Sequence, residues 1–204
     1  MTTALLFFAV LLSILFAFWR LVFLRNPRRT IPTGNFLLAP ADGTIVACQQ
    51  FEASNISLNK NDNRLRGRIV TLTSDIAERG YIVAIFMSVL NVHYNRAPMS
   101  GRVVSVVHSK GTLMPVNTLK AGLTNEKTEI VIENKKAKIK VIQIAGFVAR
   151  RIETYVKPGD TVERGQIIGR INLGSQVMLV LPESLKPTLE LKQKVTAGET
   201  SIAN

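Results

Sequence analysis

An uncharged apolar run at the N-terminus is the feature that most limits how this chain can fold. Residues 4–19, "ALLFFAVLLSILFAFW", carry no charge, and after Arg20 the apolar stretch continues to residue 24. As a helix this stretch would be about 31 Å long, close to the roughly 30 Å hydrocarbon core of a bilayer. Arg20 is near enough to one end for its guanidinium to reach the headgroups. The run therefore predicts a membrane anchor over residues 1–25, which either spans the bilayer or lies in one leaflet.

The charges beside this run predict its orientation. Arg25, Arg28 and Arg29 follow the run, and nothing charged precedes it except the chain's own amine. A secretory signal peptide would show the opposite order, with its positive charges first and a small-residue cleavage site last. By the positive-inside rule, we expect a protein of the cell membrane whose remaining chain lies on the cytoplasmic side.

Composition limits the partners and the metal chemistry. The 204 residues include 26 Lys and Arg against 14 Asp and Glu, a net charge of +12, which predicts an anionic partner. The basic stretch "RLRGR" (64–68) contains no aromatic residue for stacking on bases, so a lipid surface is favoured over nucleic acid. The single Cys48 excludes an intrachain disulfide, and with only two histidines we expect no metal site.

Beyond a polar, proline-bearing linker at 26–37, short β-branched runs alternate with Gly, Pro, Asn and Asp. This pattern predicts a mainly β, barrel-sandwich-like domain over 38–204, preceded by the one membrane helix. Within the domain, only "SDIAERG" (74–80) is expected to be helical. The predicted strands are "TIVAC", "RIVTLT", "YIVAIFMS", "RVVSVV", "TEIVIEN", "AKIKVIQIA" and "QVMLVLP".

An internal repeat suggests two similar β-units. "APADGTIVA" (39–47) and "APMSGRVVS" (97–105) share the pattern A-P-x-x-G-x-[IV]-V-x. A turn explains the glycine in each copy, but not why Asp42 in one copy replaces Ser100 in the other. That difference marks Asp42 as a candidate for chemistry. A third segment, 156–171, is similar to biotinyl and lipoyl modules but lacks their modified lysine, so this likeness concerns the fold only.

Several segments, in their order and spacing, resemble the short form of the phosphatidylserine decarboxylase family, which includes archaeal archaetidylserine decarboxylases. The resemblance runs from about residue 23 to the C-terminus. The segments that carry it are "FLRNPRRTIP" (23–32), "APADGTIV" (39–46), "VLNVHYNRAPMSGRV" (89–103), "INLGSQVMLVLP" (171–182) and "VTAGETSIA" (195–203).

This resemblance implies a proenzyme that cuts itself between Gly174 and Ser175, giving chains 1–174 and 175–204. The Ser175 hydroxyl would attack the Gly174 carbonyl, and Ser175 would become an N-terminal pyruvoyl group, the expected cofactor. A hydroxyl needs a neighbouring base, and the resemblance gives this role to His93. Asp42 would hold the imidazole in the correct tautomer.

The implied reaction is decarboxylation of the serine headgroup of a phospholipid. The pyruvoyl ketone would bind the headgroup amine and accept the electron pair left by CO2. His93 would then protonate the carbanion, and Arg96 is a candidate for holding the substrate phosphate. The substrate would be phosphatidylserine, giving phosphatidylethanolamine, or the archaeal ether-lipid equivalent. The expected partners are the membrane, the lipid, and the two cleaved chains as a heterodimer, with further dimerisation left open.

The sequence departs from the family pattern at two places. Longer members have a second histidine shortly after the first, whereas Asn95 and Arg96 occur here, so either His93 serves both steps or Arg96 shares them. Gln176 follows the serine where Thr, Ser or Arg is usual. The alternative from another class is a non-enzymatic, membrane-tethered barrel-sandwich adaptor, which would need none of Ser175, His93 and Asp42.

Overall fold

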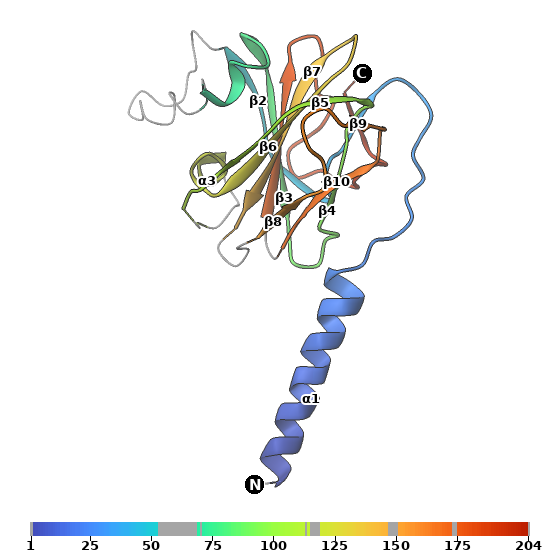
Figure 1. The fold of residues 1–204 in the computed structure, drawn as a ribbon, viewed down its shortest axis with the longest axis vertical. Coiled ribbons are helices and arrows are strands. Elements are labelled where there is room, and N and C mark those ends of the chain that lie inside the picture. Colours follow the sequence, from blue (N-terminus) through green and yellow to red (C-terminus); the bar gives the residue numbers. More distant parts are fainter. Residues whose placement is uncertain are drawn as a thin grey trace.

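The computed structural model shows one long N-terminal helix attached to a β domain (Figure 1). It describes residues 2–52, 69, 71–112, 114, 119–146, 151–172 and 175–203. Helix α1 (Thr2–Phe18) continues into a π-helical turn, η1 (Trp19–Phe23). Together they contain a 21-residue stretch, Thr3–Phe23, that is long and apolar enough to cross a membrane, and none of it is buried against the domain over its most apolar window.

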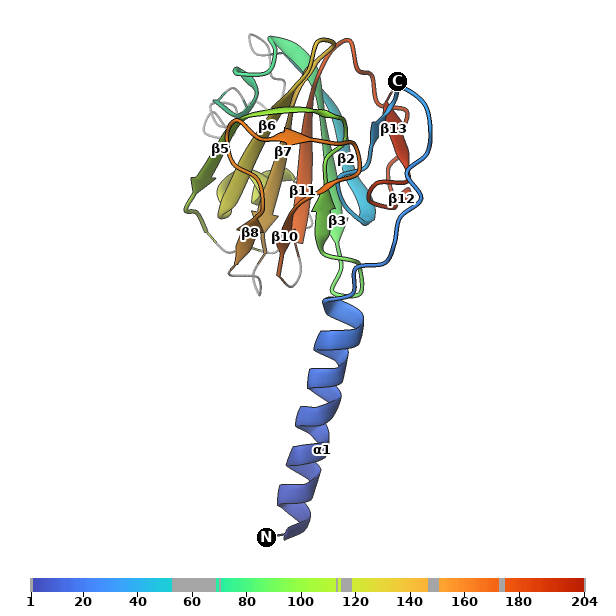
Figure 2. The same cartoon turned by 45° about the vertical axis from the view of Figure 1, so that its right-hand side comes forward.

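The β domain is built on one antiparallel sheet of eight strands, in the order β12-β2-β3-β11-β7-β6-β5-β9. The sheet curls around a smaller one, β4-β10-β8, and a third pair joins β1 to β13 (Figure 2). The strands are β1 (Leu37–Leu38), β2 (Gly43–Glu52), β3 (Arg79–Met87), β4 (Tyr94–Arg96), β5 (Gly101–Ser109), β6 (Lys127–Glu133), β7 (Lys138–Ala145), β8 (Ile152–Thr154), β9 (Thr161–Val162), β10 (Ile167–Ile171), β11 (Ser175–Pro182), β12 (Lys194–Val195) and β13 (Ser201–Ala203). The mainly β, barrel-sandwich-like fold predicted from the sequence is confirmed.

Strand β11 is buried on both faces. Val177 and Leu179 lie on the inner face, in the cluster that also contains Ile168 and Ile171 of the small sheet. Met178 and Val180 lie on the outer face, in a second cluster that includes Leu72 and Leu123. Because side chains alternate along a strand, Ser175 shares the inner face with Val177 and Leu179. The serine therefore points toward the space between the two sheets.

The predicted repeat has a structural counterpart. Gly43 opens β2 and Gly101 opens β5, and each strand has a register shift at the same offset from its glycine. A Cβ on Gly43 would lie 2.2 Å from the Phe86 carbonyl oxygen, and one on Gly101 would lie 2.5 Å from that of Glu133. Both copies thus need glycine because a neighbouring strand passes too close for any side chain.

Two local predictions are wrong. The segment "RIVTLT" was predicted as a strand, but Ile69 and residues 71–73 are helical, while residues 68 and 70 lie outside the described chain. The helix expected at 74–80 is instead a turn at 74–76 followed by the start of β3. The helical turn packs Ile69 and Leu72 onto the outer face of the large sheet, and this tertiary contact outweighs their β propensity. A short helix, α3 (Leu119–Thr124), was not predicted.

The segment between the long helix and β1 is bound along the β domain. The guanidinium of Arg164 donates to the carbonyls of Pro32, Gly34 and Phe36. The backbone amide of Thr30 donates to the Glu199 carboxylate at 3.0 Å. These contacts come from chain positions more than 120 residues apart. They hold the end of the helix at a defined place on the domain.

Candidate active site

Ser175 is the first residue of β11 and has no solvent exposure. Across the ladder it lies opposite Met87 on β3 and Ala145 on β7. Its hydroxyl donates to the Met87 sulfur at 3.4 Å, a weak acceptor. Gly174, the other half of the predicted cleavage site, lies outside the described residues. Of the two residues at the predicted cleavage site, the structure thus describes Ser175, whose buried hydroxyl lies at the start of a central strand.

His93 lies just before β4. This strand pairs with β10 in the small sheet, which packs over the inner face of the large sheet. Its backbone carbonyl accepts a hydrogen bond from the Ile171 amide at 3.2 Å, four residues before Ser175 in the chain. Its ring Nδ1 lies 2.8 Å from the Asn91 carbonyl oxygen. A carbonyl only accepts, so Nδ1 carries the proton and Nε2 is left with a free lone pair. Nε2 is buried and has no hydrogen-bond partner among the described residues.

This environment keeps the imidazole neutral. Phe23, the last residue of η1, covers the His93 ring with 4.2 Å between ring centroids, and both side chains are fully buried. The pKa of His93 is lowered from 6.5 to about 4, mainly by burial and to a lesser degree by the nearby positive charge of Arg25. The Asn91 hydrogen bond and the charge of Asp42 oppose this shift in the pKa. At neutral pH the ring is therefore an unprotonated base with Nε2 as its basic atom.

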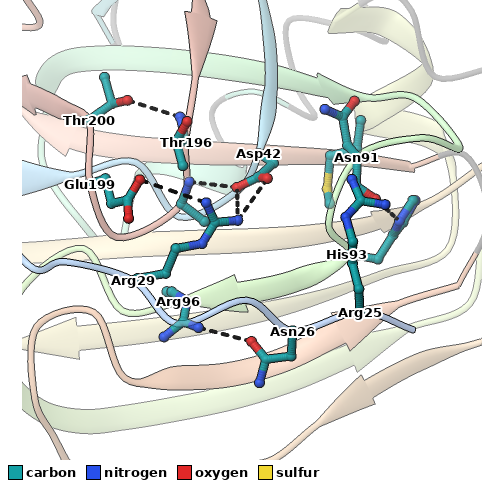
Figure 3. Close-up of polar contacts among 12 residues, drawn as sticks. Arg25, Asn26, Arg29, Asp42, Asn91, His93, Arg96, Thr196, Glu199 and Thr200 are labelled. Carbon is teal, nitrogen blue, oxygen red and sulfur yellow. Dashed lines mark hydrogen bonds and ion pairs between the residues drawn. The ribbon is translucent and has the colours of Figure 1, made fainter. Parts of the chain in front are cut away.

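Asp42 is engaged with a different partner (Figure 3). Both of its carboxylate oxygens accept from Arg29 Nη2 at 2.9 Å, and one accepts from the Ala197 amide at 2.8 Å. Arg29 also lies 3.7 Å from the Glu199 carboxylate. The contact that sets the His93 tautomer, which the sequence assigned to Asp42, is made here by the Asn91 carbonyl. Asp42 affects His93 through its charge.

Arg96 ends β4 and is bound to the protein. Nη1 donates to the Gly165 carbonyl at 2.8 Å and Nη2 to the Asn26 side chain at 3.0 Å. Burial lowers its pKa, and the nearby Arg29 adds to this effect. In Figure 3 Arg96 lies beside the segment that follows the helix. The structure thus brings Arg96 close to Asn26 and Arg29, and its phosphate-binding role stays a prediction.

A buried amide, rather than a second histidine, contacts the same Met87 sulfur as the serine. Asn95 Nδ2 contacts the Met87 sulfur at 3.7 Å, the same sulfur that accepts from Ser175. Asn95 Oδ1 accepts from Gln143 Nε2 at 2.8 Å, and Gln143 Oε1 accepts from Thr154 at 3.4 Å. The sequence noted Asn95 only as a departure from the pattern of longer relatives. Its position shows that this departure places a neutral polar group near Ser175.

A cavity of about 320 Å³ separates Asp42 from the loop that bears His93. Its polar lining combines one carboxylate, one ammonium group and several neutral groups. These are Asp42, Lys194, Ser88, Asn91, Thr44 and Thr196. Because Asp42 is already paired with Arg29, Lys194 is the lining charge that can meet an anionic group of a ligand. Sequence reasoning missed Phe23, Asn91 and Lys194, because only the fold brings these distant positions to His93 and Asp42.

Fold and site together define a class: an enzyme whose β domain, carried on an apolar helix, combines a buried serine with an imidazole base. The sequence profile of the family described as phosphatidylserine decarboxylase matches residues 16–203. This chain belongs to the phosphatidylserine decarboxylase family, which makes it a carboxy-lyase of that type. The family assignment disfavours the non-enzymatic adaptor.

Individual relatives match this chain over most of their length and have similar names. The chain is 37% identical to a provisionally named archaetidylserine decarboxylase proenzyme of Methanocaldococcus jannaschii, over 97% of this chain and 94% of the relative. It is 40% identical to a provisionally named archaetidylserine decarboxylase proenzyme of Methanothermobacter thermautotrophicus, over 89% and 78%. It is 34% identical to a phosphatidylserine decarboxylase proenzyme of Pelobacter propionicus, over 96% and 80%.

Proposed function

We propose that this chain is a proenzyme that cuts itself between Gly174 and Ser175 and then decarboxylates the serine headgroup of a membrane phospholipid. The observation that carries the proposal is the buried Nε2 of His93, which has no hydrogen-bond partner among the described residues and belongs to a residue bonded through its backbone to Ile171, four residues before Ser175. Relatives named as proenzymes support the self-cleavage. Proton removal from Ser175 requires a base that is neutral at the working pH, and His93 meets this requirement.

The surroundings of Ser175 fit the pyruvoyl group that this cleavage would leave. The side chains opposite are Met87 and Ala145, which offer neither charge nor a strong nucleophile that would consume a ketone. The pyruvoyl ketone supplies an electron sink for the pair released when CO2 leaves. His93 Nε2 would relay from solvent the proton that replaces CO2, because the neutral ring holds no proton there of its own. Asn95, which contacts the same Met87 sulfur as Ser175, adds a neutral polar group near the serine.

The cavity next to Asp42 is the proposed place for the headgroup. Lys194, which lines this cavity, would attract the phosphate of the headgroup and leave the amine free to bind the pyruvoyl ketone. Arg96 is the alternative phosphate ligand, although both of its terminal nitrogens already donate to the protein. Relatives named for ester-lipid and ether-lipid substrates are similarly close to this chain, so both lipid backbones are candidates.

The helix Thr3–Phe23 is proposed to anchor the enzyme in the membrane that holds its substrate. Its length matches the hydrocarbon core, and Arg25, Arg28 and Arg29 follow its end. The positive-inside rule then places the β domain on the cytoplasmic side. The net charge of +12 suits attraction to an anionic leaflet.

Mass spectrometry of the purified, denatured protein tests the cleavage. We expect two chains, 1–174 and 175–204, the second starting with a pyruvoyl group and therefore closed to Edman degradation. Ser175→Ala removes the nucleophile and should leave one uncut chain. Ser184→Ala, an exposed serine beyond the end of β11, is the matched control and should be cut normally. Cleavage of Ser175→Ala at the same bond would refute the mechanism.

The substrate is tested with the processed protein in vesicles. Phosphatidylserine and archaetidylserine are offered separately, and CO2 release is measured. We expect release from at least one of them, and none from the Ser175→Ala protein. Release from neither lipid by fully cleaved protein would refute the proposed reaction while leaving the self-cleavage intact.

A further inference from the structure

The loop between β3 and β4 (residues 88–93) lies against the end of the long helix. Figures 1 and 2 both show this green loop beside the upper end of α1. Arg25 joins them, because Nη1 donates to the Val22 carbonyl at 2.6 Å and Nη2 to the Leu90 carbonyl at 2.5 Å. The loop tip and the helix end are therefore at the same level of the molecule.

The tip of this loop is apolar and exposed. Val89 is 43% exposed and Leu90 is 61% exposed. Among the described residues of the β domain, no other two consecutive large apolar side chains are both exposed. Two adjacent exposed apolar residues on a tight loop are costly in water, and such patches mark contact surfaces.

Several polar groups of the loop are hydrogen-bonded within the loop or to Arg25. Asn91 Oδ1 accepts from both the amide and the hydroxyl of Ser88 at 2.8 Å, and the Asn91 amide donates to the Ser88 carbonyl at 3.0 Å. The carbonyls of Asn91 and Leu90 accept from His93 and Arg25. These hydrogen bonds lower the cost of moving the loop into a weakly polar medium, where each unpaired group would cost several kcal/mol.

The position of the helix end indicates which medium the loop tip would enter. If Thr3–Phe23 spans the roughly 30 Å core, Phe23 marks its boundary, and Leu90 lies at the level of the glycerol and headgroup region. Trp19, one turn before this boundary, and Arg25, just beyond it, are residue types found at membrane interfaces. The occupant of the Val89–Leu90 tip is therefore the bilayer leaflet into which the helix end emerges.

We infer that the β3–β4 loop is a second membrane contact, in which Val89 and Leu90 insert into the leaflet beside the anchor. This inference rests on the proposed anchoring of the helix. Phe23 and Arg25 already join the helix end to the domain, and a second contact with the leaflet would fix the tilt of the domain relative to the membrane. His93 follows the tip by three residues, so insertion holds the candidate catalytic base at the membrane surface, where a headgroup reaches it without the lipid leaving the leaflet.

The test uses the full-length protein in phosphatidylcholine–phosphatidylglycerol vesicles, with Cys48→Ser to remove the one native thiol. A polarity-sensitive fluorophore is attached at Leu90→Cys, and lipids carrying a nitroxide near the headgroup serve as quenchers. Leu191→Cys is the matched control, since Leu191 is equally exposed, at 63%, but lies outside the β3–β4 loop, in the turn before β12. Leu12→Cys in α1 reports on the anchor itself.

We expect strong quenching at Leu90 and none at Leu191, with Leu12 quenched by nitroxides placed deep in the acyl chains. Quenching at Leu12 but not at Leu90 overturns the inference and leaves the anchor standing. No quenching at Leu12 overturns both. A blue-shifted but unquenched Leu90 probe also overturns the inference, because it shows that a protein surface, such as a second copy, covers the tip.

Activity gives a second readout that does not depend on labelling. The double variant Val89→Ser, Leu90→Ser should be cut at Gly174 at the normal rate, which also shows that it folds. Its kcat/KM on vesicle lipid should fall roughly tenfold, mostly through KM, the size expected for losing the partial burial of two aliphatic side chains. Leu191→Ser should leave both quantities unchanged. Unchanged kcat/KM in the double variant contradicts a role for the loop in presenting substrate.

Discussion

At the scale of single residues, one aromatic ring from the helix end contributes to the burial that lowers the pKa of His93. Phe23 covers the imidazole, and burial is the main reason that the pKa of His93 is about 4. Phe23→Ala admits water to the ring, so the pKa should rise toward the ordinary value of about 6.5. An NMR titration of the His93 ring in uncut Ser175→Ala protein measures this change. Leu21→Ala, on the same turn but 74% exposed, should leave the pKa unchanged.

The same residue gives stability a pH dependence of definite sign. Between pH 6.5 and about 4, His93 binds a proton in the unfolded chain but not in the folded one. The contribution of His93 to the free energy of unfolding is therefore complete above pH 6.5 and is lost as the pH falls toward 4. This loss should be smaller in Phe23→Ala. Equal pH dependence in urea unfolding of the two proteins would contradict the account of Phe23.

At the scale of secondary-structure elements, the repeated glycines set how closely the strands approach. Gly43→Ala places a methyl group against the Phe86 carbonyl, and Gly101→Ala places one against that of Glu133. Each should lower the free energy of unfolding by about 1–3 kcal/mol, as overpacking usually does. Urea denaturation measures this, with Thr44→Ala as the control next in line on β2. If the Gly43→Ala protein were as stable as the Thr44→Ala control, the neighbouring strands would be able to move apart to make room for the methyl group, which would contradict this account.

The elements also show what the sequence could and could not predict. The alternation in "QVMLVLP" predicted β11 correctly, and Val177, Leu179 and Leu181 do share one face. "RIVTLT" looks equally strand-like but is helical where described, because the packing of Ile69 and Leu72 decides its conformation and a single-segment pattern does not contain that packing.

The sequence could predict residues of the candidate site only where a chemically reactive residue type lies in a recognisable motif. Ser175, His93 and Asp42 could be chosen as reactive residue types in a recognisable order. The partners that tune them could not: Asn91 acts through a backbone carbonyl, which every residue has. Phe23 belongs to a run whose composition indicates only a membrane helix, and its contact with His93 links residues 70 positions apart. Such contacts follow from the tertiary fold rather than from local sequence.

At the scale of the whole molecule, self-cleavage would divide the large sheet. The 30 residues of chain 175–204 include β11, which pairs with β3 and β7 in the middle of the sheet, and β12 and β13, which pair with β2 and β1. We expect the two chains to copurify under native conditions, because their shared hydrogen bonds and apolar burial persist after the cut.

Refolding should then differ between cut and uncut protein. Uncut Ser175→Ala closes its sheet within one chain, whereas the cleaved enzyme must bring two chains together in a bimolecular step. After unfolding in urea and dilution, recovery of native circular dichroism should be independent of protein concentration for Ser175→Ala. For the cleaved enzyme it should fall as the protein is diluted. Concentration-independent recovery of the cleaved enzyme would show that the short chain is dispensable for folding.

The packing of Phe23 on His93 bears on how this enzyme is prepared for study. Deleting the hydrophobic N-terminus is a common way to make such a protein easier to purify. Here a chain starting after Leu24 would lose the ring that shields the imidazole from water. A pH–rate profile recorded on that shortened enzyme would describe a solvated histidine, which the intact enzyme does not have.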